Sequence, residues 1–263
     1  MRAKKMHPIL FEIAGLKITT YGLMVAIAFL SSIYLAAEFA KKQGIKSDVI
    51  FDLGFIVIIW GIIGARLLYV LIWYKDYIKD PLSILKVWEG GLVFYGGFIA
   101  AFLAAVIWVI RKKLDFFKLA DIAAPFIAFG HSIARIGCFF AGCCYGRASD
   151  CAGAFCGVIF PVLQDNTPRY PAQLYESFAN FLNFLLLMIF YKKFKKENGD
   201  VIFLYLLNYG IIRTIIEFFR GDPERGKIFF FSTSSFISLV MILSAGLWFF
   251  YFRHKKTWKK QER

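Results

Sequence analysis

Three arginines, Arg66, Arg135 and Arg213, lie inside long apolar stretches, whereas the other 29 of the 32 Lys and Arg residues fall between or beside those stretches. An arginine at bilayer depth costs at least about 2.5–3.5 kcal/mol, so it is expected to face the protein interior or a polar cavity. Guanidinium groups stay charged in apolar surroundings and donate paired hydrogen bonds to phosphate oxygens. The three arginines therefore indicate a site that holds an anion, such as a phospholipid phosphate, inside a membrane.

The segments that carry these arginines have the length and composition of membrane-spanning helices. The 263-residue chain is 59% hydrophobic and contains 31 Phe, which is typical of a polytopic membrane protein. Its net charge of +14 does not indicate nucleic-acid binding, because the basic residues separate apolar runs and do not cover one hydrated face. An all-α integral membrane protein is predicted, with about seven spans of roughly 20 residues, near 20–40, 50–73, 91–110, 117–140, 173–191, 201–219 and 229–252.

The distribution of positive charge between the two sides predicts the orientation of the chain. The side that carries the N-terminus receives 12 Lys and Arg residues outside the spans, and the side that carries the C-terminus receives 17. The positive-inside rule therefore places the N-terminus outside, in the periplasm, and the C-terminus in the cytoplasm. The longer loops, near 74–90 and 141–172, then face outward. Residues 1–263 are expected to form a single polytopic domain, a monomer without a cleavable signal.

The segment Arg135–Arg147 reads RIGCFFAGCCYGR and lies at the outer end of the fourth predicted span. Its small residues, including Gly142 and Gly146, would let a neighbouring backbone or a ligand approach closely. Arg135 could then reach a lipid head group. The alternative is a small-residue packing seam whose arginine extends toward water, which would explain one buried arginine better than three.

A second cluster of ionisable residues follows in the sixth predicted span. Spacing of four places Arg213 and Glu217 on one helical face, with Arg220 one turn further on and Tyr209 one turn before. The carboxylate could fix a guanidinium for anion binding. The alternative is an Arg–Glu pair that satisfies itself and needs no substrate.

Several motifs together resemble the bacterial prolipoprotein diacylglyceryl transferase family. Each motif is short, but their order and spacing along most of the chain are specific. They are His7-Pro8, Tyr21-Gly22-Leu23-Met24, Gly64-Ala65-Arg66, the glycine-rich segment 90–97, Asp121 with Pro125, the segment Arg135–Arg147, YPAQLYE at 170–176, and Tyr209 through Asp222.

The resemblance implies an enzyme of the bacterial inner membrane, spanning it several times. Such an enzyme transfers a diacylglyceryl group from phosphatidylglycerol to the thiol of the lipobox cysteine of a prolipoprotein, forming a thioether and releasing glycerol phosphate. Its partners would be these two substrates and membrane lipid. The resemblance marks Arg135, Arg213 and Tyr95 as catalytic. It also marks residues expected to contact the substrate: Arg135, Tyr21, Arg66, Gly142, Gly146, Tyr209, Glu217 and Arg220.

The chain departs from the family pattern at three positions. Tyr95 stands where many members have His, and tyrosine, with a reference pKa near about 10, is a poor base. Tyr95 could position the substrate, the base could lie elsewhere, or water could take the thiol proton. His131, one turn before Arg135, is interpreted as a packed or hydrogen-bonded residue. Cys138 and Cys143 replace the usual Asn and Glu, so the roles of those residues are not transferred.

All five cysteines fall within residues 138–156. The spacing matches no standard zinc pattern and no histidine completes a ligand set, so neither a metal nor another cofactor is expected. On the outer side of a membrane a disulfide could form, for example between Cys151 and Cys156, but the pairing of Cys138, Cys143, Cys144 and these two cannot be read from sequence.

Two other functional classes are compatible with the same residues. A transporter of an anionic or phospholipid substrate could use the same arginines, although such proteins usually show paired halves with broken helices, which are not evident here. A membrane redox protein would need paired reactive thiols. Replacing Arg135 distinguishes the three classes, because it should abolish lipid transfer, impair flux, or leave thiol chemistry intact.

Overall fold

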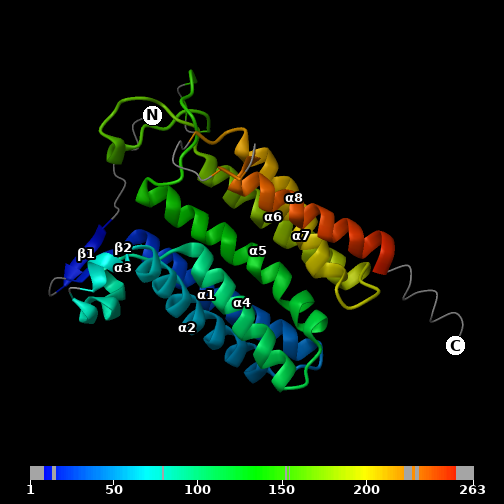
Figure 1. Ribbon diagram of the computed structural model, residues 1–263. Helices are drawn as coiled ribbons and strands as arrows, with labels where there is room; N and C mark the ends of the chain where they lie inside the picture. The colour runs from blue at the N-terminus through cyan, green and yellow to red at the C-terminus, as the bar shows by residue number, and fades with distance from the viewer. Residues whose placement is uncertain are drawn as a thin grey trace, which may run out of the picture. The chain divides into compact units, whose positions relative to one another are not determined.

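Long helices dominate the computed structural model (Figure 1). The structure describes residues 9–13, 16–78, 80–151, 153, 155–221, 227–228 and 231–252. His7-Pro8, Asp222, Pro223 and the charged chain ends used to predict orientation lie outside these residues. The long helices are α1 (Thr20–Lys42), α2 (Ser47–Ile72), α4 (Phe94–Arg111), α5 (Phe116–Ala141), α6 (Ala172–Lys193), α7 (Asp200–Glu217) and α8 (Thr233–Leu247).

Shorter elements connect these helices. Two antiparallel hairpins pair β1 (Ile9–Ile13) with β2 (Leu16–Thr19) and β3 (Lys227–Ile228) with β4 (Phe231–Ser232). The others are α3 (Tyr74–Tyr77), the 3-10 turns η1 (Pro81–Leu85), η2 (Val87–Glu89) and η3 (Pro161–Leu163), and the π-helical turn η4 (Trp248–Phe252).

Six helices in the described part of the chain are long and apolar enough to cross a membrane. They are α1, α2, α4, α5, α6 and the segment Thr233–Tyr251. The prediction of an all-α integral membrane protein is therefore confirmed at that level. Helix α7 also lies where a span was predicted, but its 18 residues include Asp200, Arg213 and Glu217. With three charged side chains in 18 residues, α7 is not among the six helices that meet this description.

The chain divides into two compact units, of which the second comprises Ile33–Leu119. In this unit α2 packs directly on α4 (Figure 1). A Cβ added to Gly97 would lie 2.7 Å from the carbonyl oxygen of Gly61, and one added to Gly64 would lie 2.5 Å from that of Gly96. These glycines therefore allow the close backbone contact that small residues commonly provide between membrane helices.

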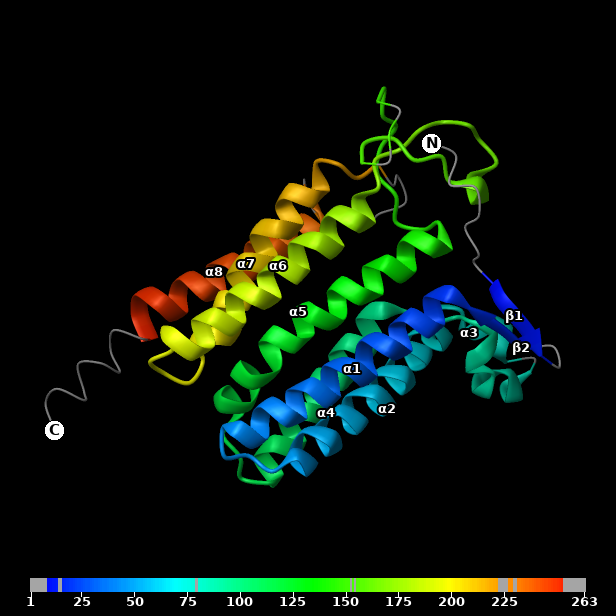
Figure 2. The same ribbon diagram turned by 180° about the vertical axis from the view of Figure 1, so that it is seen from behind.

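The first unit comprises Met1–Ser32 and Ala120–Arg263. Here α6 packs on α7 and α7 on α8, as both views show (Figures 1 and 2). Polar side chains link the helices: Ser177 Oγ donates to the Ser132 carbonyl at 2.7 Å, and Asn208 Nδ2 donates to Asn183 Oδ1 at 2.9 Å. Such bonds are favourable in an apolar interior because an unpaired polar group there is costly.

A fully buried carboxylate, Asp121, holds the start of α7 in this unit. Its oxygens accept hydrogen bonds from the backbone nitrogens of Gly199, Val201 and Ile202 at 2.9–3.0 Å, and Lys195 Nζ lies 3.0 Å away. A helix N-terminus leaves backbone N–H groups without intrahelical partners and favours negative charge. Asp121 satisfies both requirements, so its place in the recognised motifs has a structural explanation.

The connection between α5 and α6 contains the cysteine-rich segment. Gly146 forms an antiparallel bridge with Arg220, and Arg169 bridges both Ala148 and Val158. Cys151 and Cys156 form a disulfide, which confirms the example pairing offered from the sequence. Cys138, Cys143 and Cys144 are free thiols.

Candidate active site

A buried glutamate on α6, Glu176, is the centre of a cluster of positive side chains. Its side chain is fully buried, and Oε1 lies 3.0 Å from Arg135 Nη2. Its other oxygen, Oε2, lies 3.7 Å from Arg213 Nη1 and 3.8 Å from Arg220 Nη1. Residues from α5, from α7 and from just beyond α7 thus meet at one carboxylate. Arg135 and Arg213, which lie 78 residues apart in the sequence, thus both contact Glu176.

Arg213 is held in place from two sides. Its Nη2 donates to Glu217 Oε2 at 3.1 Å, one turn along α7, and to Ser234 Oγ at 2.8 Å at the start of α8. Ser232 Oγ in turn donates to Glu217 Oε1 at 2.9 Å. The Arg213–Glu217 pair predicted from spacing therefore exists. It does not satisfy Arg213 fully, because Nη1 is buried without a hydrogen-bond partner among the described residues.

Arg135 contacts an imidazole as well as the carboxylate. Its Nε donates to His131 Nε2 at 3.2 Å, and this same nitrogen lies 3.5 Å from Glu176 Oε1. The His131 ring lies 5.1 Å, centroid to centroid, from the ring of Tyr209, which also stacks on Tyr205. His131 is therefore packed and hydrogen-bonded, as the sequence suggested, but it is packed within the cluster itself. Tyr209 lies beside it.

Among the described residues, the cluster contains more positive than negative side chains. Arg135, Arg213 and Arg220 supply three guanidinium groups, and Glu176 and Glu217 supply two carboxylates. The side chains of Arg213 and Arg220 are only 10% and 6% exposed, so little water screens this charge. A buried cluster with a surplus guanidinium charge and an unused donor on Arg213 is suited to a bound anion.

The two predicted glycines on the connection after α5 have distinct backbone roles. Gly142 ends α5 with φ of 70°, a left-handed conformation that favours glycine. At Gly146 an added Cβ would lie 2.5 Å from the Phe219 carbonyl oxygen and 2.7 Å from that of Tyr170. Both positions need glycine for the local backbone, and their contact with substrate stays a prediction.

Tyr21 lies at the start of α1, within the same unit as the cluster. A Cβ added to Gly137 of α5 would lie 3.5 Å from the Tyr21 Cα and 2.8 Å from Met24 Cβ, so α1 and α5 are closely packed here. The Tyr21 side chain is 46% exposed and remains accessible to a ligand. This position is compatible with the substrate contact predicted for it.

Arg66 is buried in the other unit, where its donors bind backbone carbonyls. Nε donates to Ile84, Nη2 to Ser83, and Nη1 to Gly90 and Gly91, at 2.6–3.1 Å. Its guanidinium also lies 5.7 Å and 5.3 Å from the ring centroids of Tyr69 and Tyr77. This arrangement fixes the loop that follows α2, and it explains why an arginine is buried there without requiring an anion.

Tyr95 lies in the first turn of α4 and is 44% exposed. Its ring makes an edge contact with Phe94 at 5.8 Å between centroids. Tyr95 belongs to the same unit as Arg66, Ile33–Leu119, whereas Glu176 and its arginines belong to the other unit. The catalytic role predicted for Tyr95 therefore stays a prediction.

Some residues of the cluster received no role from the sequence. Glu176 lies within the recognised motif at 170–176, and a carboxylate inside an apolar helix was a usable signal, because such a residue needs a partner. Ser232 and Ser234 gave no signal, since serines near a helix start usually act as caps. Ser232 does cap α8, accepting from the Ser235 backbone nitrogen at 3.2 Å, while also binding Glu217.

The three free thiols lie at the end of α5, next to the cluster in sequence and in space. Gln173 Nε2 donates to the Cys143 carbonyl at 2.6 Å, three residues before Glu176. Hydrogen bonds from Cys138 and Cys143 lower the pKa of the Cys144 thiol, and the charges of Arg135 and Arg220 act in the same direction.

Known proteins share this chain's sequence over nearly its whole length. The family model described as prolipoprotein diacylglyceryl transferase matches residues 8–251. A phosphatidylglycerol–prolipoprotein diacylglyceryl transferase of Clostridium tetani is 39% identical over 241 residues, covering 90% of this chain and 94% of the relative. Proteins of the same description from Clostridium perfringens and Acinetobacter baumannii are 33% and 32% identical, covering 92% and 95% of this chain and 94% and 93% of theirs. The chain therefore belongs to the prolipoprotein diacylglyceryl transferase family.

Proposed function

We propose that this protein transfers the diacylglyceryl group of phosphatidylglycerol to the lipobox cysteine thiol of prolipoproteins, the first step of lipoprotein maturation. Family membership over residues 8–251 supports the reaction and both substrates. The observation that carries the proposal is the convergence of three arginines, Arg135, Arg213 and Arg220, on the single buried carboxylate of Glu176. A site of this kind suits the phosphate of the lipid.

In this reaction the thiol sulfur forms a bond to a glycerol carbon, and the bond from that carbon to the phosphate ester oxygen breaks. The departing glycerol phosphate takes the electron pair of the broken bond, so negative charge grows on its oxygens. Guanidinium groups already held in place stabilise such charge without reorganisation, which is where preorganised electrostatics contribute most. Arg135 and Arg213 are proposed to bind the phosphate, with Arg220 completing the positive surroundings.

Glu176 and Glu217 are positioning residues in this scheme. Glu176 lies 3.0 Å from Arg135 and 3.7 Å from Arg213, and Glu217 holds the other side of Arg213 through Nη2. These two carboxylates offset part of the repulsion between the three guanidinium groups, and Arg213 Nη1 keeps a donor without a hydrogen-bond partner among the described residues. Tyr21, Tyr209, Gly142, Gly146 and Arg66 remain proposed substrate contacts.

The lipobox thiol must also lose its proton. Tyr95 is the catalytic residue proposed to act on this thiol. A free thiol has a pKa of about 8.5 and is only slightly ionised at neutral pH, so a positive cavity favours the thiolate. Tyr95 would then orient the thiol, and the proton could pass to water.

The decisive experiment measures transfer from labelled phosphatidylglycerol to a lipobox peptide by the purified protein. Arg135→Ala and Arg213→Ala should each lose at least about 10²-fold in rate, the typical cost of removing one preorganised donor. Arg111→Ala is the matched control, because Arg111 is an exposed arginine at the end of α4. An intact parent protein that transfers no label, or arginine variants that transfer at the parental rate, would overturn the proposal.

The protein is further proposed to be a monomer in the bacterial inner membrane with seven spans. Six helices support this count directly, and α7 would be the seventh because it packs between α6 and α8. An N-terminus outside and a C-terminus in the cytoplasm follow from the charge distribution. Reporter fusions after residues 42, 111 and 193 should all report the cytoplasmic side, and a fusion after residue 221, between α7 and α8, should report the periplasm. A cytoplasmic signal from the fusion after residue 221 would exclude α7 as the seventh span.

A further inference from the structure

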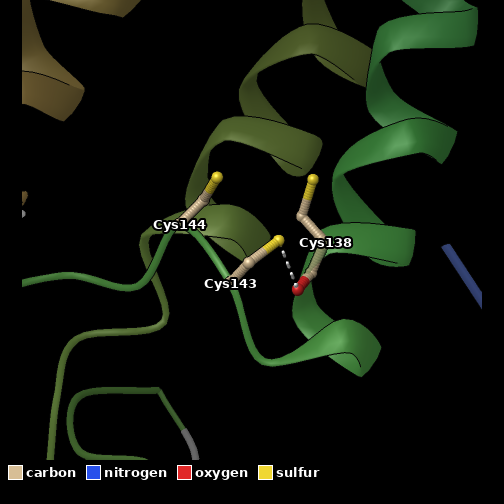
Figure 3. A group of neighbouring side chains, drawn as sticks. All are labelled: Cys138, Cys143 and Cys144. Atoms are coloured by element: carbon tan, nitrogen blue, oxygen red, sulfur yellow. Dashed lines mark hydrogen bonds between the residues drawn. The ribbon is translucent and has the colours of Figure 1, made fainter. Parts of the chain in front are cut away.

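We propose that Cys138, Cys143 and Cys144 form a binding site for one soft, thiophilic metal ion of the Zn²⁺ and Cd²⁺ class. Their three sulfur atoms lie within 4.8 Å of one another at the end of α5 (Figure 3). Thiolate sulfur is the ligand that such ions prefer in proteins. The proposed lipid transfer does not require this site, and the two can be tested separately.

The backbone at the end of α5 brings the first two thiols together. The Cys143 nitrogen donates to the Cys138 carbonyl at 3.2 Å, and the Gly142 nitrogen donates to the Phe139 carbonyl at 3.1 Å. With Gly142 at φ 70°, these bonds form a Schellman motif, in which the side chains flanking the glycine turn usually touch. Here those side chains are Cys138 and Cys143, so the helix ending itself pairs the two thiols.

The third thiol is added by an unusual backbone conformation. Cys144 has φ of 61°, a left-handed conformation that is uncommon for residues other than glycine. In Figure 3 the side chains of Cys144 and Cys138 point in the same direction. The Cys143 sulfur lies between the end of α5 and the segment that follows it. Two consecutive cysteines in an extended segment would point in opposite directions. The turn at Cys144 therefore places a third ligand at the helix end.

The dimensions of the cluster fit a metal ion. Tetrahedral zinc with Zn–S bonds of about 2.3 Å keeps its sulfur ligands about 3.8 Å apart. Sulfurs already within 4.8 Å can reach that spacing through small side-chain rotations. Three protein ligands leave one coordination position for water or an external ligand, as in open zinc sites.

The surroundings provide access and supporting groups. Cys138 is buried while Cys143 is exposed, so an ion can enter from the Cys143 side. Gln173 is held by the Cys143 carbonyl, and its buried amide oxygen lacks a hydrogen-bond partner among the described residues, so it could accept from a metal-bound water.

The cysteine spacing alone predicted no metal site, but the folded chain brings three thiols together. The adjacent pair Cys143-Cys144 fits no standard zinc spacing, because in those patterns two or more residues separate the paired cysteines. Here the helix ending pairs Cys138 with Cys143, and the left-handed backbone of Cys144 adds the third sulfur. The remaining cysteines, Cys151 and Cys156, are bonded to each other and do not compete for the ion.

The test uses a Cys151→Ser/Cys156→Ser background, in which the three proposed ligands are the only cysteines of the chain. Cd²⁺ titrated into this reduced, detergent-solubilised protein should bind at one equivalent and produce the ultraviolet thiolate-to-cadmium band. Adding Cys138→Ser, Cys143→Ser or Cys144→Ser should each weaken binding by at least about tenfold, since even loss of a supporting outer group costs about 10–100-fold.

Three outcomes would overturn the proposal. They are no thiolate band in the background protein, equal binding by a variant in which all five cysteines are Ser, and a thiol count of one in protein purified without reductant. The last result would show that two of the three thiols form a disulfide. If the background does not fold, Cd²⁺ should protect the same three thiols of the unaltered chain from maleimide, as mapped by mass spectrometry, and absence of protection would also reject the site.

Discussion

Two carboxylates, Asp121 and Glu176, are fully buried in the same helical unit, but their surroundings differ. Asp121 accepts three backbone N–H groups and pairs with Lys195, so its hydrogen-bonding capacity is used within the fold. Neither oxygen of Glu176 accepts a hydrogen bond among the described residues, although three arginines and His131 lie within 3.0–3.8 Å. A buried charge that is fully satisfied indicates structure, whereas one surrounded by excess opposite charge indicates a binding site.

The positions of the two carboxylates reinforce this contrast. Asp121 lies near the start of α5 and Arg135 lies 14 residues later, about 21 Å along the helix axis. One end of α5 thus secures the N-terminus of α7, and the other end presents Arg135 to Glu176. The same helix carries a stabilising device and a candidate active site at opposite ends.

The largest expected effect is on catalysis by Glu176→Gln. The amide keeps the shape but removes the charge that positions the arginines, so the transfer rate should fall by about 10²–10³-fold, as for loss of one preorganised group. The rate is measured with labelled phosphatidylglycerol. Phosphatidylglycerol affinity should change less than the rate, because the arginines remain charged. If a folded Glu176→Gln protein transfers lipid at the parental rate, Glu176 has no functional role that sets it apart from Asp121.

Asp121→Asn should instead reduce stability. The amide cannot accept at both positions and leaves Lys195 unpaired, so the free energy of unfolding should fall by about 3 kcal/mol, typical for breaking a buried ion pair. Thermal unfolding in detergent checks the change. The folded fraction should retain parental transfer activity, and a specific loss of activity without loss of stability would contradict a structural role.

Arg66→Lys extends the comparison to the second unit. An ammonium group cannot reach the four carbonyls that the Arg66 guanidinium binds, so stability should fall by about 2 kcal/mol through lost hydrogen bonds to a charged group. Protease accessibility of the 80–91 loop should increase. If lipid affinity falls while the loop stays protected, Arg66 contacts the substrate directly, as the sequence predicted.

Ser234→Ala should have the smallest effect. Its hydroxyl accepts from Arg213 Nη2 at 2.8 Å, and Glu217 would still hold that group after the substitution. Loss of one hydrogen bond to a charged group, about 1.5 kcal/mol, corresponds to roughly a tenfold lower rate. Ser238→Ala is the matched control on the same helix, because its hydroxyl donates to the Ser234 carbonyl at 2.9 Å and, among the described residues, does not contact Arg213. Equal rates in the two variants would show that Ser234 does not position Arg213.

The sequence was sufficient for the features that depend on local composition. Apolar runs predicted the helices to within a few residues, and spacing of four predicted the Arg213–Glu217 pair. The start of α4 at Phe94, not near 91, follows from Gly90 and Gly91, whose positive φ values of 92° and 69° interrupt helical geometry. Such features could be predicted because each is determined by residues close together in the chain.

The sequence alone determined the membrane class, the family and the arginines that merit attention, because these depend on residue types and order. Only the tertiary structure showed that Glu176 joins Arg135, Arg213 and Arg220, that Arg66 binds loop carbonyls, and that three thiols meet at the end of α5. The sequence gives the residue type of a buried charge, but it does not show whether backbone groups or other side chains surround it. Its role depends on partners up to 81 residues away, which chain folding alone brings into contact.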